Sequence, residues 1–223
     1  MTIDDSIRFL EAIFGPFGAD GGVPVDELEA AESRLGFALP RALRTLHGRT
    51  GRVKSLHAAH NRLVAIDEVD FADDHLVFYE ENQDVVVWAI ARSRLSEEDP
   101  PVDQGQLADD EWTFYSEFAS VSEFACAQGA WQAVQGGLPF VGVVQQPADA
   151  RRLDAAAMTK AFGAPSLLAE GMSAWLVEGG VAIDAGDGYV GLATRDAAAF
   201  ESASALLGLE LGAWDYATAR DDP

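Results

Sequence analysis

The segment that decides the fold spans residues 76–90 and reads LVFYEENQDVVVWAI. It contains two runs rich in β-branched and aromatic residues, at 76–80 and 85–90, and such residues favour strands. Between them lies a short polar loop at 81–84. Two strand-like runs joined by a short polar loop are typical of an antiparallel β-hairpin.

Upstream of this hairpin the sequence predicts three short helices, over residues 3–14, from about 25 to 35, and from 40 to 48 or 51. Apolar residues recur at helical spacing in the first of them, which stops at a Gly-Pro pair. Gly36 is suited to end the second helix in the left-handed conformation. Pro40 is suited to start the third. A strand-like run at 63–66 follows these helices.

Downstream the pattern mixes strands and helices. It predicts one further strand within 102–115 and then a helix that a glycine pair ends. A strand, a short helix, a three-stranded meander with tight turns and a last helix follow. The tail from 217 to 223 is expected to fray. The expected ranges are 120–134 for the first helix, 140–144 for a strand, 154–162 for the short helix, 172–177, 181–184 and 189–194 for the meander, and 196–207 for the last helix.

These elements predict an α+β fold in which N-terminal helices pack on a mainly antiparallel β-sheet, with a C-terminal strand meander and helix. We assign residues 1–138 to an α+β domain. Residues 139–223 are expected to pack on that domain and to extend it in one continuous unit; a second lobe is the alternative.

Composition narrows the classes of function. The net charge of −22 repels nucleic acid and anionic membrane, so a cationic protein is the expected partner. A role of the charge in solubility or in adaptation to a habitat stays open. The single cysteine, Cys126, cannot form an internal disulfide and fits a reducing compartment. The first residues are acidic where a signal peptide is basic, and no apolar run approaches the ~20 residues of a membrane span, so we expect a cytoplasmic protein.

The charge is unevenly distributed. Residues 33–66 contain seven Lys or Arg and no Asp or Glu, whereas residues 67–125 contain 17 acidic side chains and two arginines. We expect the two segments to neutralise each other in part, and the remaining acidic side chains to be available to a partner.

Two motifs carry a family resemblance. A helix that ends in Leu35-Gly36, followed by Leu39-Pro40 and another helix, resembles the opening signature of the SUKH (Smi/Knr-type) superfamily. The strand–Glu-Asn-Gln–strand hairpin that ends at Trp88 is similar to the second signature of that family, and residues 99–102, DPPV, resemble a third segment. The resemblance covers roughly residues 25–135.

The resemblance implies an α+β fold with helices packed on a sheet. Bacterial members are typically immunity proteins that bind and silence a cognate toxin, often a nuclease, and fungal relatives act as regulatory scaffolds. The acidity of this chain agrees with the first role, because an acidic protein can occupy a basic, phosphate-binding cleft. A non-toxin regulatory scaffold that binds another cytoplasmic protein remains the alternative.

Eight residues of the hairpin loop and of the acidic loops after it are the predicted partner-binding residues. Structural roles are the alternative. Asn82 and Gln83 are also suited to hold the turn, and the acidic loops are suited to form a solvated surface. Trp88 is expected to lie in the core. The eight residues are Glu80, Glu81, Asn82, Gln83, Asp84, Glu98, Asp99 and Asp103.

Several patterns that resemble catalytic motifs lack the required context. Residues 186–191 fit G-x-G-x-x-G but run into a predicted strand instead of a helix, so we interpret them as a hairpin turn. His47, His57 and His60 lie in a basic stretch and are expected to face solvent, without further metal ligands at suitable spacing. Cys126 is expected to be a core residue. We therefore predict no catalytic residue, metal or cofactor and regard the chain as a binding protein; an enzyme with an unrecognised site is the third hypothesis.

Overall fold

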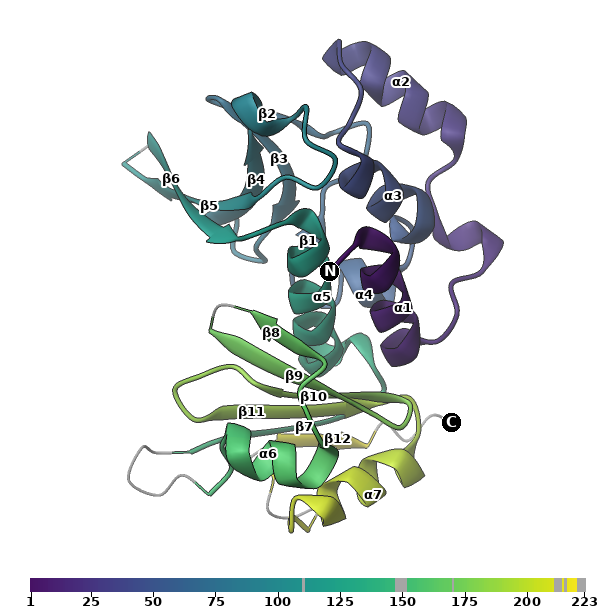
Figure 1. The fold of residues 1–223 in the computed structure, drawn as a ribbon, viewed down its shortest axis with the longest axis vertical. Coiled ribbons are helices and arrows are strands. Elements are labelled where there is room, and N and C mark those ends of the chain that lie inside the picture. Colours follow the sequence, from purple (N-terminus) through teal and green to yellow (C-terminus); the bar gives the residue numbers. More distant parts are fainter. Residues whose placement is uncertain (110, 147–151, 170, 211–213, 215, 220–223) are drawn as a thin grey trace. The chain divides into compact units, whose positions relative to one another are not determined.

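The computed structural model describes residues 1–109, 111–146, 152–169, 171–210, 214 and 216–219. The chain forms two compact units, and each has its own antiparallel sheet (Figure 1). Unit 1 comprises Met1–Arg8 and Phe17–Ala125, and unit 2 comprises Phe9–Pro16 and Cys126–Pro223. The predicted α+β class is confirmed. The units divide within two helices, at residues 8/9 and 125/126, whereas we predicted a domain boundary at 138/139.

The predicted N-terminal helices are confirmed almost to the residue. Helix α1 spans Ile3–Phe14, α2 spans Val25–Leu35 and α3 spans Arg41–Thr50. A fourth helix, α4 at Lys54–His57, was not predicted. Helix α5, Val121–Gln132, corresponds to the helix expected at 120–134, and the irregular turn η3 at Ala133–Gly137 ends it.

Glu32 organises the chain reversal between α2 and α3. Gly36 adopts the left-handed conformation (φ 81°) and donates its N–H to the carbonyl of Glu32 at 2.9 Å. The Glu32 carboxylate then accepts the N–H of Leu39 at 3.0 Å and pairs with Arg44 at 3.2 Å. Leu39 and Pro40 are buried, Leu35 is half-buried, and Pro40 caps α3. The Leu-Gly/Leu-Pro motif thus has a structural role that depends on Glu32.

We expect Glu32→Ala to lower the free energy of unfolding by about 1–3 kcal/mol, because the partly buried Leu39 N–H loses its acceptor and Arg44 loses its carboxylate. Glu32→Gln, which keeps an acceptor, should lose less. Urea denaturation checks both variants. The matched control is Glu29→Ala on the exposed side of the same helix, for which less than about 0.5 kcal/mol is expected. Equal losses at positions 29 and 32 would contradict this role.

Sheet A of unit 1 is entirely antiparallel in the order β1-β3-β4-β5-β6, and β2 pairs with β3. The hairpin predicted at 76–90 is confirmed as β3 and β4. One strand was expected within 102–115; the structure has two, β5 and β6, which form a second hairpin. The short strand β2 was not predicted, and the run at 63–66 contributes one residue to β1. The bounds are β1 Arg62–Leu63, β2 Asp70–Ala72, β3 His75–Glu80, β4 Val86–Ala91, β5 Val102–Ala108 and β6 Glu111–Phe118.

Phe124 of α5 lies at the centre of an aromatic core in unit 1. Its ring is fully buried and packs against four other rings from sheet A at centroid distances of 5.1 to 5.8 Å. These rings belong to Phe78, Tyr79, Trp88 and Phe118. Trp88 is 6% exposed, which confirms the core interpretation of this residue, and its indole N–H donates to the carboxylate of Glu117 at 2.7 Å.

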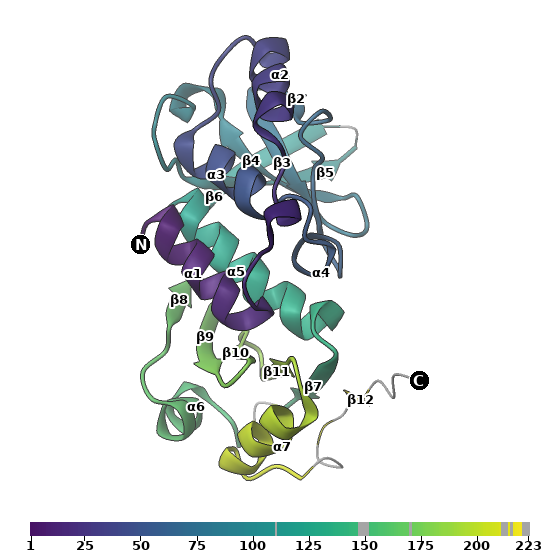
Figure 2. The same ribbon diagram turned by 90° about the vertical axis from the view of Figure 1, so that its right-hand side faces the viewer.

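Sheet B of unit 2 has the order β12-β7-β11-β10-β9-β8 and is also antiparallel. Helices α6 at Ala155–Phe162 and α7 at Ala197–Leu206 cover one face of it (Figure 2). Asp154 and Asp196 cap these helices through their carboxylates. The strands are β7 Phe140–Gln145, β8 Leu167–Ala169, β9 Met172–Val177, β10 Gly180–Asp184, β11 Tyr189–Thr194 and β12 Tyr216–Ala219.

The C-terminal meander and its flanking helices are confirmed, but two expectations about this part of the chain are wrong. No described strand of sheet B pairs with sheet A, so the meander builds a second sheet and does not extend the first. Residues 216–219 of the tail form β12 instead of fraying; residues 220–223 lie outside the described residues. The short strand β8 was not predicted either.

The glycine-rich segment between β10 and β11 is a hairpin turn, as the sequence indicated. Gly186 and Gly188 both have positive φ, and a side chain on Gly188 would lie 2.0 Å from the carbonyl oxygen of Gln146. These glycines therefore meet the needs of a tight turn beside β7, which accounts for the G-x-G spacing without a nucleotide.

Candidate protein-binding surface

The β3–β4 turn is built by its own polar residues. Asp84 has a φ of 60° and donates its N–H to the carbonyl of Glu81 at 3.1 Å, while the Glu81 carboxylate accepts the N–H of Gln83 at 3.2 Å. The amide of Asn82 lies 3.2 Å from Nδ1 of His60. Part of the Glu-Asn-Gln-Asp motif thus shapes the turn, although residues 82–84 are exposed.

Glu80 differs from the residues that follow it. It lies on β3 opposite Arg62 of β1, and the two side chains form an ion pair. Arg62 also lies 3.9 Å from Glu68. The Glu80 carboxylate is therefore paired with a cation of the same chain.

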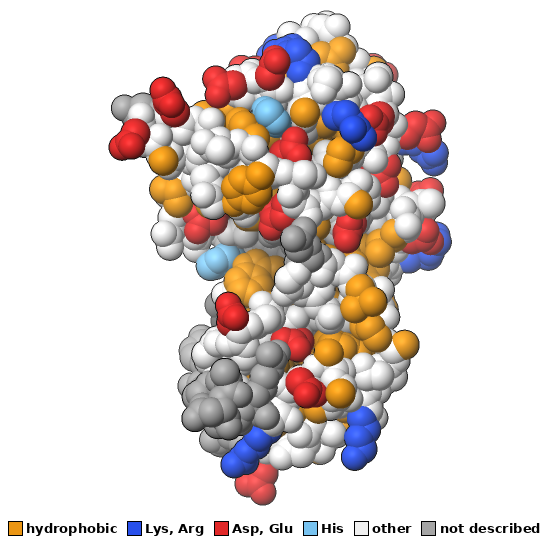
Figure 3. Space-filling model, turned by 60° about the vertical axis from the view of Figure 1, so that its left-hand side comes forward, with side chains coloured by type: hydrophobic (Ala, Val, Ile, Leu, Met, Phe, Trp, Pro, Cys, Tyr) orange, Lys and Arg blue, Asp and Glu red, His pale blue; other side chains and the backbone are white. Residues whose placement is uncertain are grey.

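The topology brings a second acidic turn to the same end of sheet A. Strands β3 and β5 both run towards this end, so the turn at 81–84 and Asp109, which follows β5, lie at the same end of the sheet. Asp109 (φ 53°) and Glu111 are exposed there, beside Val85 and Leu107, which are 48% and 38% exposed. Figure 3 shows acidic side chains gathered at the projecting end of the β5–β6 hairpin.

We call this surface the acidic end of sheet A. It consists of Glu81, Asp84, Asp109 and Glu111 with the apolar Val85 and Leu107, and Asp110 lies outside the described residues. Among the described residues no ion pair joins any of its four carboxylates to a Lys or Arg. Asp109 and Glu111 belong to the acidic loops that the sequence offered as a partner-facing surface or a solvated one, although they were not among the eight selected residues.

Glu98 and Asp99 lie at the opposite end of the sheet, in the connection between β4 and β5, so the eight predicted residues do not form one surface. The backbone carbonyl of Glu98 accepts the N–H of Ala42 at 2.8 Å. The carboxylate of Asp99 accepts the N–H of Ser122 in the first turn of α5 at 3.0 Å. The Asp99 carboxylate thus caps the first turn of α5, and its predicted role in partner binding stays a prediction.

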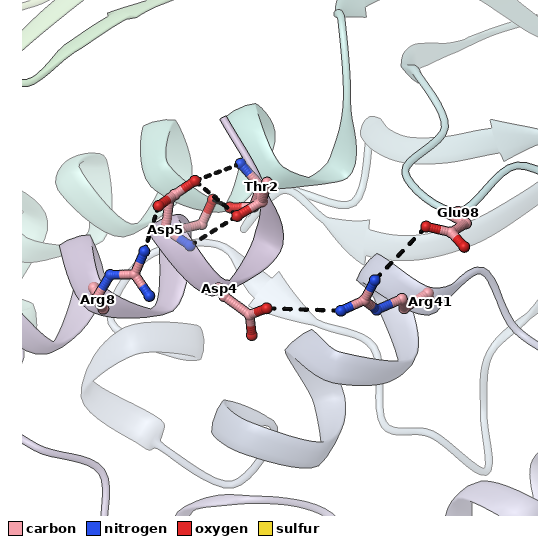
Figure 4. Close-up of polar contacts among 7 residues, drawn as sticks. Thr2, Asp4, Asp5, Arg8, Arg41 and Glu98 are labelled. Carbon is pink, nitrogen blue, oxygen red and sulfur yellow. Dashed lines mark hydrogen bonds and ion pairs between the residues drawn. The ribbon is translucent and has the colours of Figure 1, made fainter.

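Arg41 joins two acidic side chains near Glu98. Its guanidinium lies 3.7 Å from the carboxylates of Asp4 and of Glu98 (Figure 4). These residues line a hollow of about 290 Å³ beside the start of α1. In that helix start, hydrogen bonds from Thr2 to the carboxylate lower the pKa of Asp5. The carboxylates at this end of the sheet thus cap the first turns of helices or form ion pairs within the chain.

Asp103 lies on β5 and faces His75 across the sheet, with Nε2 and a carboxylate oxygen 3.3 Å apart. Both side chains are 19% exposed. The ring of His75 stacks on Phe114 at a centroid distance of 3.7 Å. Asp103 is therefore held in the outer face of sheet A, away from the two acidic turns.

The basic segment neutralises part of the acidic segment, as expected. Arg41 and Arg62 pair with acids of residues 67–125, whereas Arg44 and Arg52 pair with Glu32 and Glu27 of α2. Arg34 donates to backbone carbonyls. Much of the positive charge of residues 33–66 is thus used within the helical part of unit 1.

Two of the three histidines expected to face solvent are buried. His47 is 1% and His57 is 7% exposed, and the imidazole Nε2 of His57 lies 2.9 Å from the hydroxyl of Thr50. Burial lowers the pKa of His47 to about 4, and burial together with the neighbouring His47 lowers the pKa of His57 to about 3. Within the described residues no three His, Cys, Asp or Glu side chains are placed to hold a metal ion. Cys126 is fully buried, as predicted.

No protein-family model matches the chain, and no curated protein or solved structure is significantly similar to it. The described part of the chain contains no helix that is both long and apolar enough to cross a membrane.

Proposed function

We propose that this chain is an intracellular immunity-type protein that binds a cationic toxin and neutralises it through the acidic end of sheet A. The observation that carries the proposal is that the acidic turn at 81–84 and the acidic residues Asp109 and Glu111 lie at the same end of the sheet. The resemblance of the hairpin to the SUKH superfamily supports the immunity role, and the proposed location is the cytoplasm.

The surface has the composition that a basic partner requires. Its four carboxylates have no Lys or Arg partner among the described residues, so their field acts outward. Val85 and Leu107 provide exposed apolar area between the carboxylates. Opposite charge accelerates encounter, up to about 10⁸–10⁹ M⁻¹s⁻¹ at low salt, and apolar contacts slow dissociation. Fast capture suits a protein that must act before a toxin reaches its substrate, and a nuclease with a basic cleft is one such toxin.

The test is co-expression and titration with the product of the adjacent gene. We expect the fourfold variant Glu81→Gln/Asp84→Asn/Asp109→Asn/Glu111→Gln to bind it at least about tenfold more weakly at low salt, with the loss mainly in the association rate. Asn replaces both aspartates of positive φ because it tolerates this conformation. Added salt should weaken the native complex and reduce the difference between the proteins.

A matched control removes the same number of charges elsewhere. Glu29, Asp67, Glu178 and Glu201 are all exposed, and their neutral amide variants should bind nearly as the native chain does. An equal loss in both fourfold variants would show that net charge, and not the acidic end, drives binding. If the native chain neither binds nor silences a neighbouring gene product, the immunity role is wrong and the scaffold alternative takes its place.

A further inference from the structure

The outer edge of strand β6 is open. β6 pairs with β5 along Glu111–Phe118, and no described strand pairs with its other edge. Thr113, Tyr115 and Ser116 are exposed. An edge strand of this length presents a row of unpaired backbone donors and acceptors, which is a template for another strand.

The hydrogen-bond pattern identifies the residues whose backbone faces outward. Leu107 donates its N–H to the carbonyl of Val85, the residue before β4, at 3.1 Å. Because backbone groups alternate in direction along a strand, the N–H and C=O of Gln104 and Gln106 point to β6, where they oppose Tyr115 and Thr113. The backbone groups of Trp112, Phe114 and Ser116 therefore point to the open edge.

Side chains on both faces hold this edge in a regular conformation. On one face Phe114 stacks between His75 and Trp112 and packs directly on Gly105, where a Cβ atom would lie 2.5 Å from the ring. On the other face the Tyr115 hydroxyl bonds to the side chains of Gln104 and Gln106. A strand that is already ordered loses less entropy when another strand is added.

The negative charge around the open edge of β6 favours a cationic segment as the added strand. Residues 102–118 contain no Lys or Arg, and carboxylates lie at both ends of β6, at Glu111 and at Glu117. Half-exposed Trp112 and Phe114 offer ring faces on which a guanidinium can stack. An antiparallel second copy would bring Glu111 of one chain towards Glu117 of the other, which like-charge repulsion disfavours.

We infer that β6 receives an extended, Arg- or Lys-rich segment of the partner as an added antiparallel strand. The segment bonds to the outward backbone groups of Trp112, Phe114 and Ser116, and its cationic side chains meet the exposed carboxylate of Glu111 at the start of the strand. This inference rests on the proposed function, because it describes how a cationic partner extends from the acidic end of sheet A along the neighbouring edge.

The experiment titrates the ¹⁵N-labelled full chain with an acetylated and amidated peptide of alternating Arg and Val, eight residues long to match β6. We expect slower hydrogen exchange at the amides of Trp112, Phe114 and Ser116. The amides of Thr113 and Tyr115, which already face β5, serve as an internal control and should change little. The same peptide N-methylated at all its backbone amides has the same charge and should protect none of them.

Two substitutions of Ser116 on the open edge form a matched pair of variants. Ser116→Pro removes one outward N–H and obstructs an added strand, while Pro is tolerated on an open edge. Ser116→Ala keeps the N–H. We expect Ser116→Pro to weaken peptide binding about tenfold and Ser116→Ala to leave it nearly unchanged. Equal binding by the two variants, equal binding of the N-methylated peptide, or no binding at all would overturn the edge inference.

The two proposals fail in different ways. If the native chain binds the adjacent gene product and Ser116→Pro binds it as well as Ser116→Ala does, the edge inference is wrong and the acidic end remains the binding surface. If the native chain binds no adjacent gene product, the proposed function is wrong, whatever the peptide does. The peptide titration then reports the chemistry of the edge alone.

Discussion

Acidification from about pH 7.5 to about pH 5 is expected to remove about 4 kcal/mol from the free energy of unfolding of unit 1, about 2 kcal/mol for each of His47 and His57. Both side chains are buried as neutral imidazoles, with pKa values lowered to about 4 and about 3. In the unfolded chain the pKa of each is near the ordinary value of about 6.5. Stability is therefore fully present above about pH 6.5 and falls progressively as the pH decreases towards the folded-state values.

The surroundings of the two rings explain the direction of this effect. Thr50 donates its hydroxyl to the carbonyl of Leu46 at 2.7 Å, so Nε2 of His57 is the donor in the contact with Thr50. Nδ1 of His57 and Nε2 of His47 are buried and without a hydrogen-bond partner among the described groups. A proton added at either atom would create a buried charge without an acceptor, which is costly.

Urea denaturation at a series of pH values measures the effect. The double variant His47→Gln/His57→Gln removes both titrating groups, and the glutamine at 57 retains a donor for Thr50. Its stability should change much less between about pH 7.5 and pH 5, although the carboxylates still contribute to both proteins. The same pH dependence in the native and double-variant chains would contradict this account.

Phe124→Ala is expected to destabilise unit 1 by about 3–5 kcal/mol, because removing the ring leaves a cavity among four aromatic neighbours that cannot all move inward. The near-UV circular dichroism of the aromatic side chains should change as well, since Trp88 and Tyr79 both contact this ring. Urea denaturation measures the loss of stability.

Phe124→Leu fills most of the same space and should lose less than half as much. The control is Val25→Ala at an exposed position of α2, 59% accessible, where a change under about 0.5 kcal/mol is expected. If Phe124→Ala cost no more than this control, the aromatic cluster would not be the centre of the core.

The helices could be predicted from the sequence because local signals fix their ends. Gly15, Gly36 and Pro40 mark the bounds of the first three helices, and Asp154 and Asp196 cap the last two. The short strands were missed because two or three residues carry no periodicity. The split of 102–115 into β5 and β6 was missed although Asp109 and Asp110 favour a turn.

The burial of His47 could also have been predicted from the sequence. Leu43, Leu46, His47 and Thr50 recur at helical spacing, so His47 lies on the apolar face of α3; the basic composition of the segment obscured this pattern. For the candidate site, the hairpin loop was identified from its motif. That this loop lies beside Asp109 and Glu111 could not be predicted, because it depends on the order of strands in sheet A. The strand order also explains why Glu98 and Asp99 lie at the opposite end of the sheet.

The open edge of β6 has a consequence for the handling of the protein. Its aromatic-rich strand has the composition of an aggregation-prone segment, and Asp109, Glu111 and Glu117 act as gatekeepers whose negative charge keeps two chains from pairing edge to edge. Because salt screens this repulsion, purification and storage at low ionic strength should best keep the chains from pairing edge to edge.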